Sequence, residues 1–286
     1  MKLSKIALMM DLSDMDKIVL NYIKKINENY KFDQITLIHF IEVENFPDEV
    51  LKLYPDLDEP IESIIGDELK EYAQEFFGQE DVKTDVHVHK KGGIENLLEW
   101  IDRENYDLVA MGKKPNHYGS GTFSSKVARL SNNNTLFVSE IARGEINKIM
   151  VPVDFSSYTN NALKIAKESA DLLGAELIPV HAIKVGMQYF PFIKDKKEIM
   201  KELEKSAAKK YKKIKSKLKL KEDCVIIEDI DQHISKTIYD RAVFESVDLI
   251  VLGNKGKADD SEFLIGSVAE RMIAPDKNLP VLIVKN

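Results

Sequence analysis

The sequence predicts an α/β protein made of two tandem domains, each a five-stranded parallel sheet of the Rossmann-like type. Three observations point to this fold. Short apolar segments alternate with longer amphipathic segments, an order typical of parallel sheets covered by helices. The second half of the chain repeats the first. The 286 residues also suit two domains of ordinary size, so each half can bury its own core.

The repeat consists of five matched segments that keep their order and lie 141 to 145 residues apart. A period this long indicates duplicated domains rather than a solenoid. We expect one domain over residues 1–142 and a second over 143–286, joined by the polar passage at 139–145. The matched pairs are Lys5–Ser13 with Lys148–Ser156, Leu37–Phe40 with Pro179–Ala182, Asp107–Gly112 with Asp248–Gly253, Val127–Ala128 with Val268–Ala269, and Thr135–Val138 with Pro280–Ile283.

Each half reads as strand and helix in alternation and ends on a fifth strand. In the second half, apolar runs predict the strands, spacings of three and four predict the helices, and Gly174 is a stop signal for the first helix. The carboxyl ends of parallel strands form the usual ligand-binding edge, where we expect Asp154, Ala182 and Gly253 to converge. In chain order the expected elements are Ile149–Asp154, Asn160–Leu173, Glu176–His181, a lysine-rich helix within Lys194–Lys221, Cys224–Glu228, Ser235–Glu245, Asp248–Leu252, Ser267–Ile273 and Val281–Val284.

Composition indicates an ordinary globular protein, with 44% hydrophobic and 31% charged residues. No signal segment is visible at the start, and no apolar run reaches the ~18 residues that span a bilayer. Cys224 is the only cysteine, which excludes an intrachain disulfide and fits a reducing cytoplasm. We expect Cys224 to be a core residue rather than a redox group.

Charge is shared unevenly between the halves. Residues 1–143 hold 17 basic and 26 acidic residues, a net of −9, and residues 144–286 hold 24 and 22, a net of +2. Much of the basic charge lies in the lysine-rich helix, and a solvated face is the favoured interpretation over a nucleic-acid or membrane surface. The expected apolar stripe of this helix is Ile199, Leu203, Ala207, Tyr211, Ile214 and Leu218.

A glycine pattern follows the strand Asp248–Leu252. Gly253 and Gly256 are three residues apart, and Gly266 with Ser267 comes nine residues later, where a helix begins. Glycines let backbone N–H groups approach an anion closely, and a helix start favours negative charge. The pattern indicates phosphate binding, although glycines that serve only a tight turn remain the alternative.

These residues resemble the universal stress protein family along essentially the whole chain. The likeness rests on residues 151–156, on residues 180–182, and on the glycine pattern, which is similar to that family's nucleotide-binding signature. It implies an adenine-nucleotide alpha hydrolase-like fold whose second domain binds ATP, ADP or AMP, with Mg²⁺ on the phosphates. The resemblance implies contacts to the nucleotide from Pro152, Val153, Asp154, Ala182, Leu252, Gly253, Asn254, Gly256, Gly266, Ser267, Val268 and Ala269.

Within that site the resemblance implies a division of labour. Asp154 would meet the ribose or the adenine edge, and apolar side chains such as Leu252 would form the walls around the base. The backbone N–H groups of the glycine loop and of the following helix start would hold the ribose and phosphates.

The first domain departs from the glycine pattern. Gly112 keeps the first glycine, but Pro115 stands where Gly256 does, and Ser125 where Gly266 does. Proline lacks an N–H donor, so we expect a degenerate site that binds nucleotide weakly or not at all. The donor-rich segment Tyr118–Thr122 could hold an anion in another way, and Asp11 still matches Asp154.

Histidines occupy two notable settings. His39 and His181 end matching strands, which favours a shared structural role over catalysis. His87 and His89 alternate on one strand, and a metal site there is the less favoured interpretation. Trp100 reads as a helix core residue.

The predicted function is that of a cytoplasmic nucleotide-binding stress-response regulator rather than a metabolic enzyme. Slow ATP hydrolysis or autophosphorylation is an alternative, for which charged residues of the glycine loop could serve: Lys255, Lys257, Asp259, Asp260 and Glu262. A silent interaction scaffold is another. Adenylyl-transfer and pyrophosphatase enzymes are disfavoured because their signature loops are absent.

Partners beyond the nucleotide follow from the resemblance. It implies that the two domains pair through their last strands, Leu136–Ser139 and Val281–Val284, as a pseudo-dimer. A homodimer and an unknown protein partner are left open, and nucleic acid and membrane are not expected. The aromatic segment 187–192 reads either as a lid over the nucleotide or as a cap on the sheet.

Overall fold

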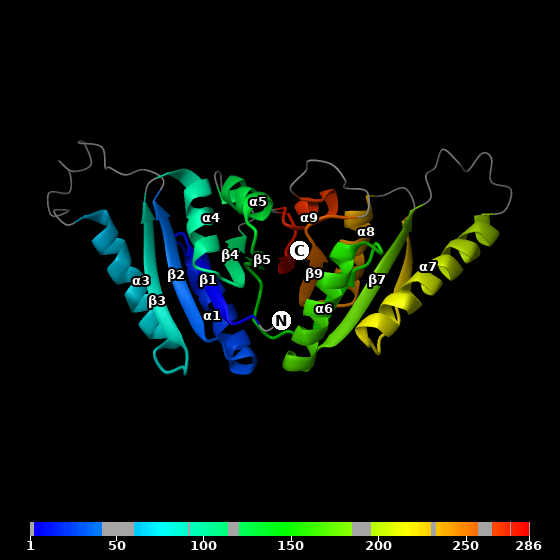
Figure 1. Ribbon diagram of the computed structural model, residues 1–286, viewed down its shortest axis with the longest axis horizontal. Helices are drawn as coiled ribbons and strands as arrows, with labels where there is room; N and C mark the ends of the chain where they lie inside the picture. The colour runs from blue at the N-terminus through cyan, green and yellow to red at the C-terminus, as the bar shows by residue number, and fades with distance from the viewer. Residues whose placement is uncertain are drawn as a thin grey trace. The chain divides into compact units, whose positions relative to one another are not determined.

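The computed structural model describes most of the chain and divides it into two compact units, residues 2–145 and 146–286 (Figure 1). Each unit is described by itself. The predicted boundary at residue 142 lies within the segment that joins the last strand of the first unit to the first strand of the second. The described residues are 3–41, 60–90, 92–113, 120–184, 196–229, 233–256, 265–274 and 276–285.

The first unit is a five-stranded parallel sheet in the order β3-β2-β1-β4-β5. Helices α1 and α3 pack beside each other, and so do α4 and α5, as expected for right-handed crossovers on the two faces of the sheet. Its elements are β1 (Lys5–Met10), α1 (Asp14–Tyr30), β2 (Gln34–Ile41), α3 (Ile61–Phe77), β3 (Lys83–Lys90), α4 (Gly93–Arg103), β4 (Leu108–Lys113), α5 (Ser120–Leu130) and β5 (Asn134–Ser139).

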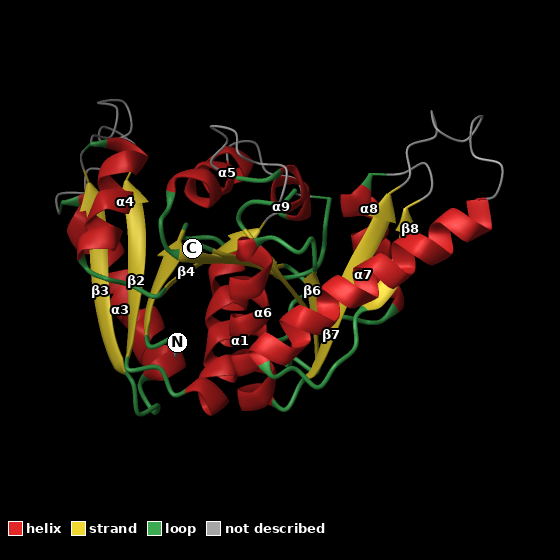
Figure 2. Cartoon of the chain, turned by 45° about the vertical axis from the view of Figure 1, so that its right-hand side comes forward, coloured by secondary structure: helices red, strands yellow, loops and turns green. Residues whose placement is uncertain are grey.

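The second unit repeats this topology, with the strand order β10-β9-β6-β7-β8 and all its pairs parallel. Figure 2 shows α6 and α7 on its sheet. The predicted fold class is therefore confirmed for both halves. The elements are β6 (Lys148–Pro152), α6 (Ser157–Leu173), β7 (Glu176–Lys184), α7 (Lys196–Leu218), β8 (Val225–Asp229), α8 (Ile234–Phe244), β9 (Leu249–Gly253), α9 (Ser267–Met272) and β10 (Val281–Val284).

The central strands are buried on both sides, which explains their nearly continuous apolar sequences. In β9 the four residues Leu249–Leu252 are all buried, and in β1 so are Ile6–Met10. A carboxylate fixes the start of each first strand. Asp107 Oδ2 accepts the backbone N–H groups of Ser4 and Lys5 at 2.8 and 2.9 Å.

Asp248 repeats this clamp in the second unit, where it accepts from Asn147 and Lys148 at 2.8 and 3.0 Å. The duplication thus extends to hydrogen bonds that join residues about 100 positions apart. It also extends to helix ends, because Gly174 (φ 68°) and Lys31 (φ 51°) both cap their helices in the left-handed conformation. The predicted stop at Gly174 is confirmed.

Helix α7 departs from its predicted packing. Ala207 and Tyr211 of the expected stripe are buried, together with Met200. Ile199 and Leu203 are each 37% exposed, however. The helix therefore rests on its sheet along a narrow line and leaves part of its apolar stripe uncovered. Over the residues that the structure describes, no helix combines the length and apolarity needed to cross a membrane.

Candidate functional site

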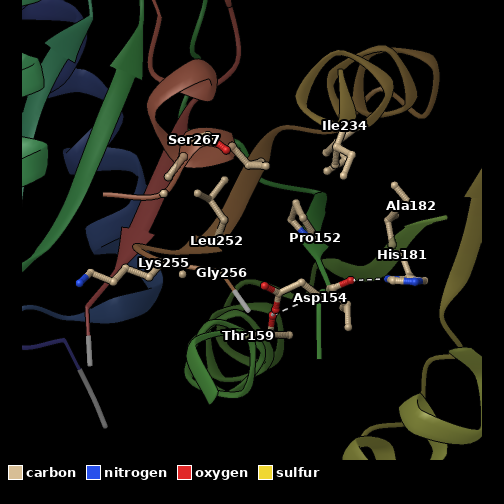
Figure 3. Close-up of a pocket in the computed structure, with 17 residues that line it drawn as sticks. Pro152, Asp154, Thr159, His181, Ala182, Ile234, Leu252, Lys255, Gly256 and Ser267 are labelled. Carbon is tan, nitrogen blue, oxygen red and sulfur yellow. Dashed lines mark hydrogen bonds between the residues drawn. The ribbon is translucent and has the colours of Figure 1, made fainter. Parts of the chain in front are cut away.

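A cavity of about 310 Å³ opens at the carboxyl ends of β6, β7 and β9 (Figure 3). The starts of α8 and α9 complete its rim. Its volume falls at the lower end of the range for small-molecule sites. The lining residues are Pro152, Val153, Asp154, Thr159, Val180, His181, Ala182, Ile234, Ile238, Leu252, Gly253, Lys255, Gly256, Gly266, Ser267, Val268 and Ala269.

The predicted site residues meet in this cavity, with one exception. Asn254 does not line it. The backbone N–H of Asn254 donates to the carbonyl of Val284 at 2.9 Å, and the N–H of Gly266 donates to the carbonyl of Asn254 at 2.6 Å. These bonds tie the glycine loop to β10 and to the start of α9. Both N–H groups therefore already have a protein acceptor in this structure, and their expected contact with phosphate stays a prediction.

Asp154 is held in place by the first turn of α6. Its Oδ1 accepts the N–H of Ser156 at 2.9 Å and the hydroxyl of Thr159 at 2.5 Å. The Thr159 oxygen in turn accepts the Asp154 N–H at 3.2 Å. Phe155, which stands between Asp154 and Ser156, is a non-glycine residue in the left-handed region at φ 65°. This tight loop fixes the orientation of the Asp154 carboxylate at the cavity.

Gly253 and Gly256 of the loop have different structural roles. A Cβ on Gly253 would lie 2.7 Å from the Cβ of Tyr158, so this glycine lets α6 pack closely on β9. A Cβ on Gly256 would lie 3.0 Å from Asp154 Oδ2. Gly256 therefore keeps the loop close to the carboxylate. The first glycine of the motif has a packing role that its spacing did not reveal.

The cavity walls are mainly apolar. Pro152, Val153, Ala182 and Leu252, which we expected to surround the base, all line it, and Figure 3 shows Leu252 beside Ser267. Sequence reasoning missed Val180 in the middle of β7, Thr159, and two residues of α8, Ile234 and Ile238. The α8 residues carry no motif, and only the position of a helix start beside the predicted rim could have suggested them.

His181 lines the cavity and is bonded to the backbone. Its Nδ1 lies 2.7 Å from the carbonyl oxygen of Val153, which can only accept, so Nδ1 carries the proton. Burial lowers the pKa of His181, and the nearby ammonium of Lys210 lowers it further. His39 repeats the contact, with Nδ1 3.0 Å from the carbonyl oxygen of Met10 and its pKa also lowered by burial. The expected shared structural role fits both rings.

Lys255 adds a cation to the rim, and Figure 3 shows its side chain extending away from Asp154. The other charged loop residues considered for hydrolysis, Lys257, Asp259, Asp260 and Glu262, lie outside the described residues, as does the segment 187–192. In the described part of the chain, no three His, Cys, Asp or Glu side chains gather in a way that could hold a metal ion.

The matching place in the first unit is built differently. Asp16 stands where Thr159 does, and its two carboxylate oxygens accept the N–H groups of Asp11 and Leu12 at 3.1 and 2.8 Å. Asp16 is 2% exposed. Burial, with the neighbouring Asp11 charge, raises the pKa of Asp16 to about 7, although the backbone bonds oppose this shift.

A second difference concerns the apolar wall. Phe40 stands where the second unit has Ala182, and its ring stacks on Phe123 of α5 with the centroids 6.0 Å apart. A bulky aromatic pair thus replaces a methyl group. Gly112 keeps the packing role of Gly253, since a Cβ there would lie 2.2 Å from Met15 Cγ. Pro115 and residues 118–119 lie outside the described residues.

The remaining candidates have structural surroundings. His87 Nε2 lies 3.2 Å from His89 Nδ1, and the His87 ring stacks on Trp100 with the centroids 3.8 Å apart. Trp100 is half-buried in this stack rather than in the core. Burial raises the pKa of the Cys224 thiol to about 12, which leaves it protonated and weakly reactive at neutral pH.

Comparisons with known proteins agree with the geometry. Two universal stress proteins of Methanocaldococcus jannaschii, MJ0531 and MJ0577, are 32% and 31% identical over 146 and 158 residues. Each alignment covers 48% of this chain, with 81% and 94% of the two relatives. The crystal structure of a universal stress protein from Archaeoglobus fulgidus matches 99% of this chain and 96% of its own at 17% identity, with a TM-score of 0.64, and so shows the same fold.

The sequence model of the universal stress protein family matches residues 2–139 and again residues 145–285. These two matches cover nearly the whole chain and coincide with the two structural units. The chain therefore belongs to the universal stress protein family, of which it carries two domains in tandem.

Proposed function

We propose that the second unit binds one adenine nucleotide per chain and that the protein acts as a nucleotide-binding regulator in a stress response. The observation that carries this proposal is the cavity at the carboxyl ends of β6, β7 and β9. An apolar pocket with a fixed carboxylate and a few hydroxyls matches the chemistry of a nucleoside, which has a flat apolar base and a polar sugar.

Each part of the nucleotide has a partner among the lining residues. The side chains of Leu252, Ile234 and Ala182 suit the faces of the base, and Asp154 suits the sugar hydroxyls or the base amine. The hydroxyl of Ser267 and the backbone N–H groups of the first turn of α9 suit the phosphates. Mg²⁺ would then be held through phosphate oxygens rather than by a cage of protein ligands.

The proposal is for a binding protein rather than an enzyme. The ionisable groups that line the described part of the cavity are Asp154, His181 and Lys255. Asp154 and His181 each hold the local backbone through hydrogen bonds. The proposed location is the cytoplasm, because a single cysteine cannot form an intrachain disulfide, which suits a reducing compartment.

Isothermal titration with ATP, ADP and AMP, each with and without Mg²⁺, tests the proposal. We expect a stoichiometry of one, and loss of binding in Gly266→Arg, because a long side chain does not fit at this buried position of the cavity lining. Ser125→Arg, the same change at the matching position of the first unit, should leave binding unchanged. A well-folded wild type that binds none of the three nucleotides would refute the proposal, and a stoichiometry of two would refute the single site.

A further inference from the structure

Helix α7 carries more positive charge than any other described helix and uses little of its surface for packing. It holds ten lysines and three glutamates, a net charge of +7. Its buried positions are Met200, Ala207 and Tyr211, which form one line along the helix. Ile214, Lys215 and Leu218 are half-buried, and Lys210 lies over the ring of Phe155 at 5.6 Å. Most other described positions of this 23-residue helix, about 35 Å long, are exposed.

Only some of the exposed lysines of α7 form ion pairs with described residues. Lys205 pairs with Glu202, and Lys215 with Asp223. Among the described residues no ion pair forms with Lys209, Lys213 or Lys217, which recur every four positions and so share one face of the helix. Six lysines fall in the last ten residues of α7, and no acidic residue stands among them. Such a face repels itself and favours an acidic partner.

The same face of the fold in the first unit has the opposite charge. Helix α3 connects β2 to β3 as α7 connects β7 to β8. It holds five acidic residues and one lysine, a net charge of −4. Glu68, Glu71 and Glu75 are exposed at spacings of three and four, so they too share one helical face.

Apolar groups accompany both charged faces. Ile199 and Leu203 of α7 and Ile64 of α3 are each 37% exposed. An uncovered pair of large aliphatic side chains one turn apart on α7 can contribute to an interface that charge alone would make weak. Charge and apolar surface therefore coincide on each of the two helices.

We propose that α7 is a docking surface for the acidic α3 face of a second copy of this chain. The second copy is favoured over a polyphosphate or an anionic membrane because the chain carries a net charge of −7, and its first half a net of −9. A nucleic acid or a lipid surface is anionic throughout and would be repelled by the acidic first half, whereas a second copy can place its acidic α3 on α7 and its own lysine-rich α7 on α3.

Each chain carries both sides of this contact, one lysine-rich α7 and one acidic α3. A two-fold dimer would therefore make the contact twice and close, and an open arrangement would make it once per chain and grow. Either assembly has the same chemical origin, and both are weakened by salt because the charged groups are exposed. The mass distribution in solution distinguishes them.

Sedimentation velocity of the full chain at 50 and 500 mM NaCl tests the proposal. We expect concentration-dependent association at low salt, weakened about ten-fold or more at high salt. Lys209→Glu/Lys213→Glu/Lys217→Glu should lose association, and so should Glu68→Lys/Glu71→Lys/Glu75→Lys. Mixing the two reversed chains should restore a complex, since each supplies the charge that the other lacks.

A matched control reverses exposed lysines elsewhere in the second unit. Lys164→Glu/Lys236→Glu should associate as the wild type does. A wild type that stays monomeric at 50 mM NaCl up to about 100 μM would overturn the proposal. So would association that survives both triple reversals. Binding of anionic vesicles or RNA by a monomeric wild type, lost in the triple lysine variant, would assign α7 to that partner instead.

Discussion

The two units share one backbone plan but differ at the place where each first strand ends. In the second unit, Asp154 is paired with the neutral hydroxyl of Thr159 and faces a cavity. In the first, a second carboxylate, Asp16, stands at the position of Thr159, is buried, and accepts the backbone N–H of Asp11. The comparison shows that a duplicated fold can keep its strand ends while the chemistry at those ends changes completely.

What separates the two sites is a small number of side chains rather than the glycine loop alone. A methyl group at Ala182 leaves room where Phe40 stacks on Phe123 in the first unit. At the position of Thr159, a neutral hydroxyl in the second unit, the first unit has Asp16, whose pKa is raised by burial and, to a smaller extent, by the neighbouring Asp11 charge. The steric and the electrostatic difference would thus both disfavour a nucleotide in the first unit.

The largest expected effect comes from moving the aromatic wall into the second unit. In Ala182→Phe we expect nucleotide affinity to fall at least about 100-fold, because a phenyl ring would fill part of a cavity of only about 310 Å³. Isothermal titration with ATP checks this. The reciprocal variant Phe40→Ala should leave affinity unchanged and serves as the control. Undiminished binding by a folded Ala182→Phe protein would place the base elsewhere.

The sequence identified most of this site for a physical reason. Strand ends and glycine spacing are local features, and Asp154, Gly256, Gly266 and Ser267 reach the cavity because parallel strands bring their carboxyl ends to one edge. The role of Asn254 could not be predicted in this way. Whether its N–H meets a ligand or the carbonyl of Val284 depends on the register of the sheet edge.

Helical spacing likewise predicted only part of the packing of α7. The pattern predicted a continuous apolar stripe, and Ala207 and Tyr211 are buried as expected. Ile199 and Leu203 are partly exposed because the line of contact with the sheet is narrower than the stripe. Amphipathic spacing shows which face of a helix turns inward, but the neighbouring elements decide how much of that face is covered.

A second prediction concerns the carboxylate pair of the first unit. Because the native pKa of Asp16 is about 7, against an ordinary value of 3.8, the native state holds a proton more tightly than the unfolded state between these values. The free energy of unfolding of the first unit should therefore fall as pH rises from about 4 to 7, by up to about 4 kcal/mol. Asp16→Thr, which copies the second unit, should flatten this slope.

Trp100 is the only tryptophan and lies in the first unit, so its fluorescence during urea unfolding reports on that unit. Asp14→Thr is the control, because Asp14 is an exposed acid in the first turn of the same helix and should leave the slope intact. An equal slope in wild type and Asp16→Thr would show that the Asp16 carboxylate is not the group that titrates.

The smallest expected effect tests what the two units keep in common. His39→Phe and His181→Phe should each lower the free energy of unfolding of their own unit by about 1 kcal/mol, because the carbonyl of Met10 or Val153 loses its donor. Burial lowers the pKa of both rings, so the native state resists protonation and stability falls as pH drops below the ordinary value of 6.5. Hydrogen exchange of the β1 and β6 amides checks both effects.

The asparagine variants separate structure from binding at these two positions. His39→Asn and His181→Asn keep an N–H donor and should retain more stability than the phenylalanine variants, without the acid sensitivity. If the two histidines hold only the backbone, both units respond alike. A His181→Asn protein that is as stable as the wild type but binds nucleotide more weakly would show that this ring, alone of the pair, contacts the ligand through the cavity that it lines.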